Sequence, residues 1–135
     1  MMVPCRLLVI EDVQNIADII CHAAADAGFE ACSANGATAT ALYDSFGPQV
    51  IVLDLLISGM GELAFLQFLK ERSSSARIVI ISGCSDAYRK QAEDLAALGG
   101  LIIEANMAKP FRINELRGTL ERIRQSISPD LKTAP

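Results

Sequence analysis

Five polar residues in this 135-residue chain end an apolar run or follow one within a few positions. Three are carboxylates, one is a hydroxyl and one is an ammonium: Glu11, Asp12, Asp54, Ser82 and Lys109. Carboxylates held close together repel one another unless a cation lies among them. Oxygen ligands with room for water suit a hard divalent ion such as Mg²⁺. A lysine and a hydroxyl beside that ion suit a phosphoryl group, so a fold that gathers these residues predicts metal-assisted phosphoryl chemistry.

Each residue also has an ordinary structural interpretation. Acidic residues such as Glu11 and Asp12 favour the positive N-terminus of a helix. Asp54 could form a turn, and Ser82 could cap a helix. Lys109 could be a solvated lysine before a turn. The stretch QVIVLDLLISGM weighs against the simple interpretation of Asp54, because an unpaired charge in an apolar strand is costly.

The elements that must position these residues alternate between strand-like and helix-like apolar patterns. Glycine or proline follows several of them, as expected where an element ends. The expected strands are Cys5–Ile10, Phe29–Ser33, Val50–Asp54, Arg77–Ile81 and Leu101–Ala105. The expected helices are Asn15–Ala27, Ala37–Phe46, Glu62–Glu71, Asp86–Leu98 and Asn114–Ile127.

Five successive strand–helix units predict an α/β fold in which helices cover both faces of a parallel sheet. The expected architecture is a doubly wound, five-stranded, flavodoxin-like three-layer sandwich with strand order 2-1-3-4-5. Ligands of such sheets bind beyond the carboxyl ends of the strands. The polar residues named above are therefore expected to meet at that edge.

The composition excludes several classes of function. A net charge of −4 and a pI of about 4.9 argue against a nucleic-acid-binding surface. No apolar run reaches the roughly 18 residues of a membrane span, and the N-terminus lacks the pattern of a signal peptide. The four cysteines form no C-x-x-C pair, so a zinc site is not expected. Their scatter predicts reduced, buried thiols in a cytoplasmic protein.

The motifs resemble those of the response-regulator receiver domain of two-component signalling, including the chemotaxis regulators. The similarity covers about residues 5–127 and rests on the order and separation of four segments. These segments are LLVIED (Leu7–Asp12), VIVLDLLISGM (Val50–Met60), IVIISG (Ile78–Gly83) and KPF (Lys109–Phe111).

The resemblance implies a role for each polar residue. Asp54 would accept the phosphoryl group, Lys109 would contact its oxygens, and Ser82 would be the switch hydroxyl. Asp12, Asp54 and the backbone carbonyl of Leu56 would hold Mg²⁺, with Glu11 acting through water. The implied partners are a sensor histidine kinase or phosphotransfer protein and a downstream effector protein or domain. Such a protein catalyses its own aspartyl phosphorylation and is not a conventional enzyme.

The chain departs from the family pattern at a few positions. The family usually has proline at the position of Ser58, and Asp-Gly at the positions of Gly61 and Glu62. Asn106 stands where the family commonly has a switch aromatic, so activation is expected to depend mainly on Ser82. The segment before Lys109 is also longer than is usual in the family and resembles that of receivers attached to cyclic-dinucleotide phosphodiesterase domains.

Residues 1–128 are expected to form one receiver domain, and residues 129–135 a disordered tail or the start of a linker. The domain could be a stand-alone receiver or part of a longer regulator, for example one with a cyclic-dinucleotide output domain.

Two other kinds of function remain as alternatives. One is a receiver-like module that binds proteins without being phosphorylated. The other is an enzyme, but an FMN site needs a hydroxyl- and glycine-rich loop after the first strand, where Glu11 and Asp12 would repel the phosphate. A phosphatase with an aspartate nucleophile usually has a second aspartate two residues later, where this chain has Leu56.

Overall fold

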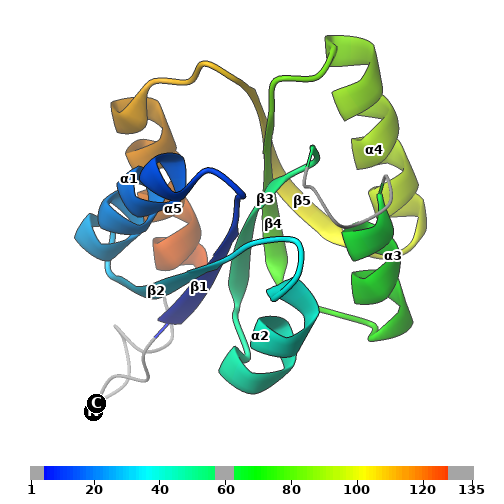
Figure 1. Ribbon diagram of the computed structural model, residues 1–135, viewed down its shortest axis with the longest axis horizontal. Helices are drawn as coiled ribbons and strands as arrows, with labels where there is room; N and C mark the ends of the chain where they lie inside the picture. The colour runs from blue at the N-terminus through cyan, green and yellow to red at the C-terminus, as the bar shows by residue number, and fades with distance from the viewer. Residues whose placement is uncertain (1–4, 57–62, 128–135) are drawn as a thin grey trace.

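The computed structural model describes residues 5–56 and 63–127, which form a three-layer α/β sandwich (Figure 1). All strand pairs are parallel, and the strand order is β2-β1-β3-β4-β5. The strands are β1 (Cys5–Ile10), β2 (Phe29–Ala34), β3 (Val50–Asp54), β4 (Arg77–Ser82) and β5 (Ile102–Ala108). The helices are α1 (Gln14–Asp26), α2 (Ala39–Phe46), α3 (Ala64–Glu71), α4 (Asp86–Leu98) and α5 (Ile113–Ile127). The predicted fold class and strand order are therefore confirmed.

The helices form two layers that bury opposite faces of the sheet. Helices α1 and α5 lie together on one side, whereas α2, α3 and α4 cover the other (Figure 1). Every residue of β3 is buried, because this strand lies between β1 and β4 and is covered on both faces. Near-continuous apolar strands are the expected consequence of such two-sided burial.

Most predicted boundaries are correct to within two residues, and the differences have local causes. Helix α2 begins at Ala39, two residues later than predicted. The Asn35 side chain accepts hydrogen bonds from the backbone amides of Ala37 and Thr38, at 2.9 and 3.1 Å, and so forms a turn before the helix. The predicted start of the third helix at Glu62 lies outside the described residues.

The fifth strand was predicted too short, because it continues through Asn106 to Ala108. Its pairing with β4 contains a register shift: Ile78 pairs with Ile103, but Val79 pairs with Ala105. Glu104 is therefore one extra residue in β5, as in a β-bulge. The length before Lys109 is thus explained by a long strand with a bulge.

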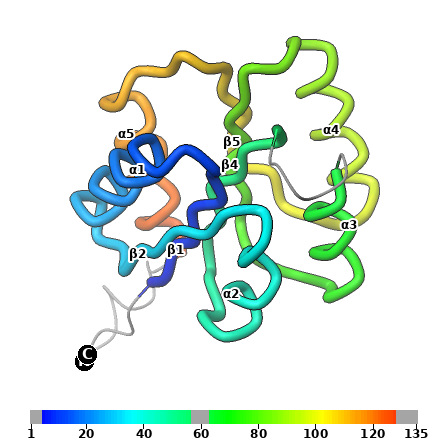
Figure 2. The backbone as a smooth tube through the Cα atoms, in the orientation of Figure 1, coloured from blue at the N-terminus to red at the C-terminus, as the bar shows by residue number. Residues whose placement is uncertain are grey.

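The carboxyl ends of the strands all lie at one edge of the sheet. The backbone trace in Figure 2 shows the loops that leave β1, β4 and β5 at this edge. The residues that follow β1, end β3 and follow β5 are thereby brought into one region, although they are far apart in the sequence.

Candidate functional site

Lys109 joins two of the predicted acidic residues at the carboxyl edge of the sheet. Its Nζ lies 2.6 Å from Oε1 of Glu11 and 2.9 Å from Oδ2 of Asp54. Glu11 directly follows β1, Asp54 ends β3, and Lys109 directly follows β5. The side chains of Glu11 and Asp54 are only 2% and 7% exposed, so their attraction to the ammonium is weakly screened by water.

The loops hold both carboxylates in place through their second oxygens. Oδ1 of Asp54 accepts a hydrogen bond of 3.0 Å from the backbone amide of Leu56. Oε2 of Glu11 accepts one of 3.3 Å from the amide of Val13, just before α1. The turn interpretation of Asp54 therefore holds, but α1 has no acidic residue in its first turn, and both carboxylates face Lys109.

The environment of Lys109 favours the charged ammonium. Burial lowers the pKa of this lysine, but the hydrogen bonds and charges of Glu11 and Asp54 outweigh burial, so its pKa is raised above the usual value. The Lys109 side chain is consequently protonated at neutral pH.

Asp12, which follows Glu11, contacts the turn between β2 and α2. Its Oδ1 accepts a hydrogen bond of 3.1 Å from the backbone amide of Gly36, in the turn between β2 and α2. Within residues 5–56 and 63–127, no three acidic, histidine or cysteine side chains are grouped as metal ligands. The structure thus brings Glu11 and Asp54 together on Lys109, whereas the role of Asp12 as a third carboxylate of the site stays a prediction.

The charges around Lys109 nevertheless fit a hard divalent cation. Two buried carboxylates face one ammonium, which leaves an excess of negative charge at the site. Mg²⁺ binds oxygen donors, and this site offers carboxylate oxygens and nearby backbone carbonyl oxygens. We therefore regard Glu11, Asp12 and Asp54 as residues suited to hold Mg²⁺.

Ser82 is the last residue of β4 and is fully buried. Its Oγ accepts a hydrogen bond of 3.3 Å from the backbone amide of Cys84, and its carbonyl accepts one of 2.9 Å from the amide of Lys109. The helix-cap interpretation of Ser82 was wrong, because Ser85 is the N-cap of α4 and accepts a hydrogen bond from the Tyr88 amide. The Ser82 hydroxyl is instead attached to the loop that leads into α4.

The loop after Asp54 is only partly described. Leu56 is the last described residue before the gap and is 57% exposed. The departures from the family pattern at Ser58, Gly61 and Glu62 lie outside the described residues.

Sequence reasoning missed a polar cluster between α4 and β5. Arg89 of α4 is buried and donates a hydrogen bond of 3.0 Å from Nη1 to Oδ1 of Asn106. Asn106 in turn donates to Oε1 of Glu93 at 2.9 Å. One feature of the sequence could have revealed this, because Arg89 lies at helical spacing from the buried Ala92 and Ala96.

The four cysteines are unpaired, as expected: Cys5, Cys21, Cys32 and Cys84. Only Cys5 is buried, so the prediction of buried thiols was wrong for the other three, which are partly exposed. Burial nonetheless raises the pKa of both Cys21 and Cys32. No described helix is both long and apolar enough to cross a membrane.

The family model of the response regulator receiver domain matches residues 7–121. Regulatory protein AtoC of Escherichia coli is 30% identical over 122 residues, which cover 89% of this chain and 25% of that protein. Sporulation initiation phosphotransferase F of Bacillus subtilis is 24% identical over 119 residues, covering 87% of this chain and 91% of that protein. The chain thus spans a quarter of one relative and nearly all of the other.

Solved structures with the same fold include receiver domains from several bacteria. The receiver domain of the Francisella response regulator 1452 has a TM-score of 0.75 at 21% identity, covering 91% of this chain and 98% of that one. The chemotaxis protein CheY4 of Vibrio cholerae has a TM-score of 0.73 at 23% identity, covering 90% and 99%. At these identities the structures support the fold itself.

Proposed function

Since this chain belongs to the response regulator receiver domain family, we propose that Asp54 accepts a phosphoryl group from a histidine kinase or phosphotransfer protein. The observation that carries the proposal is the contact of Lys109 with both Asp54 and Glu11. It pairs a buried carboxylate nucleophile with a cation at the edge of the sheet where ligands bind.

The transfer itself needs little covalent chemistry from the protein. An oxygen of the Asp54 carboxylate attacks phosphorus, and the bond from phosphorus to the donor's leaving group breaks; with acetyl phosphate, acetate leaves. The protein must position the donor and offset negative charge as the group transfers. The Lys109 ammonium is suited to this role because its neighbours hold it in the protonated form.

Receiver domains in general bind Mg²⁺, and we assign that ion to Asp12, Asp54 and the backbone carbonyl of Leu56, with Glu11 acting through water. When bound, the ion would neutralise charge on the phosphoryl oxygens. The excess of buried carboxylate over ammonium supports the assignment. The Ser82 hydroxyl, at the end of the neighbouring strand, would then hydrogen-bond the new phosphoryl group.

Receiver domains act between histidine kinases or phosphotransfer proteins and effectors, and we propose that this chain does so as a cytoplasmic signalling protein. Its output would be a change in partner binding, with no conventional substrate turnover. The carboxylates after β1 would repel the phosphate of FMN, which argues against a flavin enzyme. The described chain also has Leu56 where an aspartate phosphatase needs its second acid.

The proposal is tested by incubating the protein with acetyl phosphate and measuring its intact mass. We expect one phosphoryl group to be added with Mg²⁺ present and none with a chelator. Asp54→Asn should take up none, whereas Asp44→Asn, which changes an exposed aspartate paired with Arg72, should behave like wild type.

Phosphate uptake by Asp54→Asn equal to that of wild type would refute the assignment of the acceptor. A folded wild-type protein that takes up no phosphate from any donor would favour the phosphorylation-independent binding module. An absorbance titration with FMN and an assay with a generic phosphate ester address the enzyme alternatives.

A further inference from the structure

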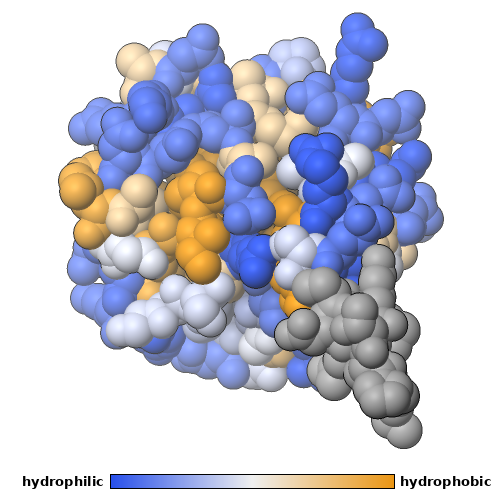
Figure 3. All heavy atoms as spheres, turned by 180° about the vertical axis from the view of Figure 1, so that it is seen from behind, coloured by the Kyte–Doolittle hydropathy of each residue, from blue (hydrophilic) through white to orange (hydrophobic). Residues whose placement is uncertain are grey.

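The apolar residues that helix α4 buries fully are both alanines. Its buried residues are Arg89, Ala92 and Ala96, and two of its leucines face outward. Leu98 is 84% exposed and Leu95 is 41% exposed. Figure 3 shows that hydrophobic groups also reach the rear surface of the molecule among hydrophilic ones. Since alanines bury little area, apolar packing alone anchors this helix weakly.

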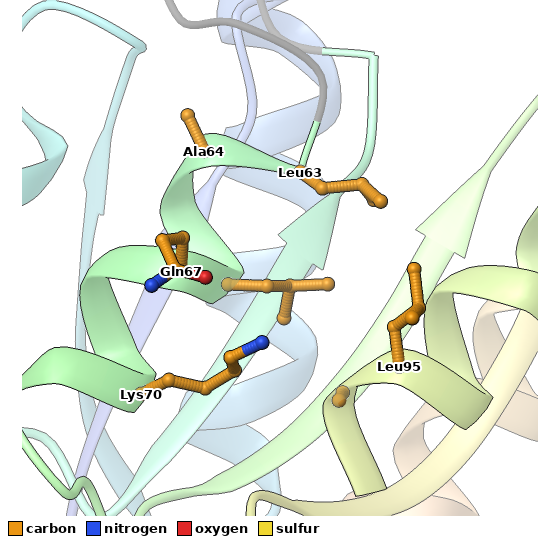
Figure 4. Close-up of a pocket in the computed structure, with 7 residues that line it drawn as sticks. Leu63, Ala64, Gln67, Lys70 and Leu95 are labelled. Carbon is orange, nitrogen blue, oxygen red and sulfur yellow. The ribbon is translucent and has the colours of Figure 1, made fainter. Parts of the chain in front are cut away.

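The contact of α4 with its neighbouring helix is also incomplete. A hollow of about 370 Å³ lies between α3 and α4, lined by Leu63, Gln67 and Lys70 on one side and Leu95 on the other. Figure 4 shows Leu95 on α4 opposite these side chains, with open space between them. The anchor of α4 must therefore come mainly from β5.

The bulge in β5 decides which residue meets α4. In a regular strand, residues three positions apart point to opposite faces of the sheet. Ile103 packs in the cluster on the α4 side, so a regular strand would turn Asn106 toward α1 and α5. The extra residue at Glu104 reverses this, because Asn106 pairs with Ile80, which belongs to the core on the α4 side.

Asn106 uses both ends of its amide to hold α4. Its Oδ1 accepts from Arg89 at 3.0 Å, and its Nδ2 donates to the Arg89 carbonyl at 3.1 Å and to Oε1 of Glu93 at 2.9 Å. The Arg89 guanidinium also pairs with Asp86 at the start of the helix. The Arg89 side chain is 11% exposed, and its Nε has no partner among the described residues. Buried guanidinium groups are costly unless bonded, so the loss of Asn106 would leave Arg89 poorly satisfied.

The start of α4 is tied separately to the proposed switch residue. The Cys84 amide donates to Oγ of Ser82, and Ser85 next to it caps the helix. A Ser82 hydroxyl that turns toward a phosphoryl group on Asp54 changes its contact with this loop. The loop can therefore respond while the Asn106 contacts further along the helix stay intact.

We propose that Asn106, Arg89 and Glu93 form a polar latch that fixes α4 on β5 and confines the response to phosphorylation to residues 82–88. The latch itself is a property of the unphosphorylated fold, whereas its confining role rests on the proposed function. Asn106, which the bulge turns toward α4, therefore keeps its contacts with this helix when the domain is phosphorylated.

Hydrogen–deuterium exchange of the unphosphorylated protein tests the latch. Asn106→Ala should speed amide exchange in residues 89–98 by about tenfold or more, because charge-assisted bonds are lost. Glu93→Ala removes one bond of the latch and should give a smaller effect in the same segment. Lys90→Ala breaks an exposed ion pair with Asp94 on the same helix and should change exchange little. Equal exchange in Asn106→Ala, Glu93→Ala and wild type would overturn the latch.

Hydrogen–deuterium exchange measured in the presence of beryllofluoride and Mg²⁺, which mimic the phosphoryl group, tests whether the latch confines the response. Wild type should change in residues 82–88, and Asn106→Ala should change through Leu98. Ser82→Ala should abolish most of the change. Changes throughout α4 in wild type as in Asn106→Ala would overturn the confining role. If beryllofluoride and Mg²⁺ change exchange nowhere in wild type, the proposed function and the confining role of the latch are both contradicted. The exchange rates of the unphosphorylated variants would still decide whether the latch exists.

Discussion

The Nζ of Lys109 lies 2.9 Å from Oδ2 of Asp54, although 55 residues separate them in the chain. The same ammonium contacts Glu11, which is 98 residues away, at 2.6 Å. One cation is therefore shared by two buried carboxylates that the sheet brings together. Removing the cation and removing one of the anions should have unequal effects on stability.

We expect Lys109→Gln to lower the free energy of unfolding by about 3–5 kcal/mol, because it leaves two buried carboxylates without their cation. Asp54→Asn should cost much less or be stabilising, since Glu11 and Lys109 then balance each other. Urea denaturation at neutral pH without divalent ions measures both changes, with Lys90→Gln on an exposed face as the control. Equal destabilisation by Lys109→Gln and Asp54→Asn would contradict this account.

The stabilising effect of Lys109 should persist into alkaline solution. Its pKa is raised in the folded protein above the usual 10.5. The contribution is therefore fully present below pH 10.5 and is lost as pH rises through the higher folded pKa. The stability difference between wild type and Lys109→Gln should be constant from neutral pH to about pH 10 and shrink only above it. A difference that already shrinks below pH 9 would show that the lysine pKa is not raised.

If Asp54 is phosphorylated, the phosphoprotein should lose its phosphate slowly. In receiver domains, the residues two positions after the acceptor and after the switch hydroxyl border the attacking water. Here they are Leu56 and Cys84, and neither orients water well. Leu56→Asn should shorten the lifetime measured by intact mass after removal of the donor. Leu98→Asn replaces a more exposed leucine on α4 and should leave the lifetime unchanged; equal lifetimes for all three proteins would refute the role of Leu56.

Binding of Mg²⁺ should change the environment of the turn between β2 and α2. Oδ1 of Asp12 accepts a hydrogen bond of 3.1 Å from the Gly36 amide, so we expect a metal bound by Asp12 to perturb this amide. Titration with Mg²⁺ should move the amide resonance of Gly36, and Asp12→Asn should remove most of that movement. Gly47, which caps the far end of α2, provides the internal reference. An unchanged Gly36 resonance while Asp54 responds would count against Asp12 as a ligand.

The order of strands and helices and the edge at which the site lies were predictable from the sequence alone. Apolar periodicity, glycines and prolines at element ends, and the right-handedness of crossovers are local or general rules, so they fix the topology. Once the topology is known, the carboxyl ends of β1, β3 and β5 place Glu11, Asp54 and Lys109 near one another.

Only the tertiary structure decided which side chains these residues contact. Asp12 follows Glu11 directly, yet it bonds Gly36, because the turn set by Asn35 presents a free amide there. The side of the sheet to which Asn106 points depends on the bulge at Glu104. That bulge arises from the pairing with β4, and no pattern of alternating apolar and polar residues reveals it in the sequence. The bulge also bears on the burial of Arg89 on α4, since it presents the Asn106 amide oxygen that accepts a hydrogen bond from this guanidinium.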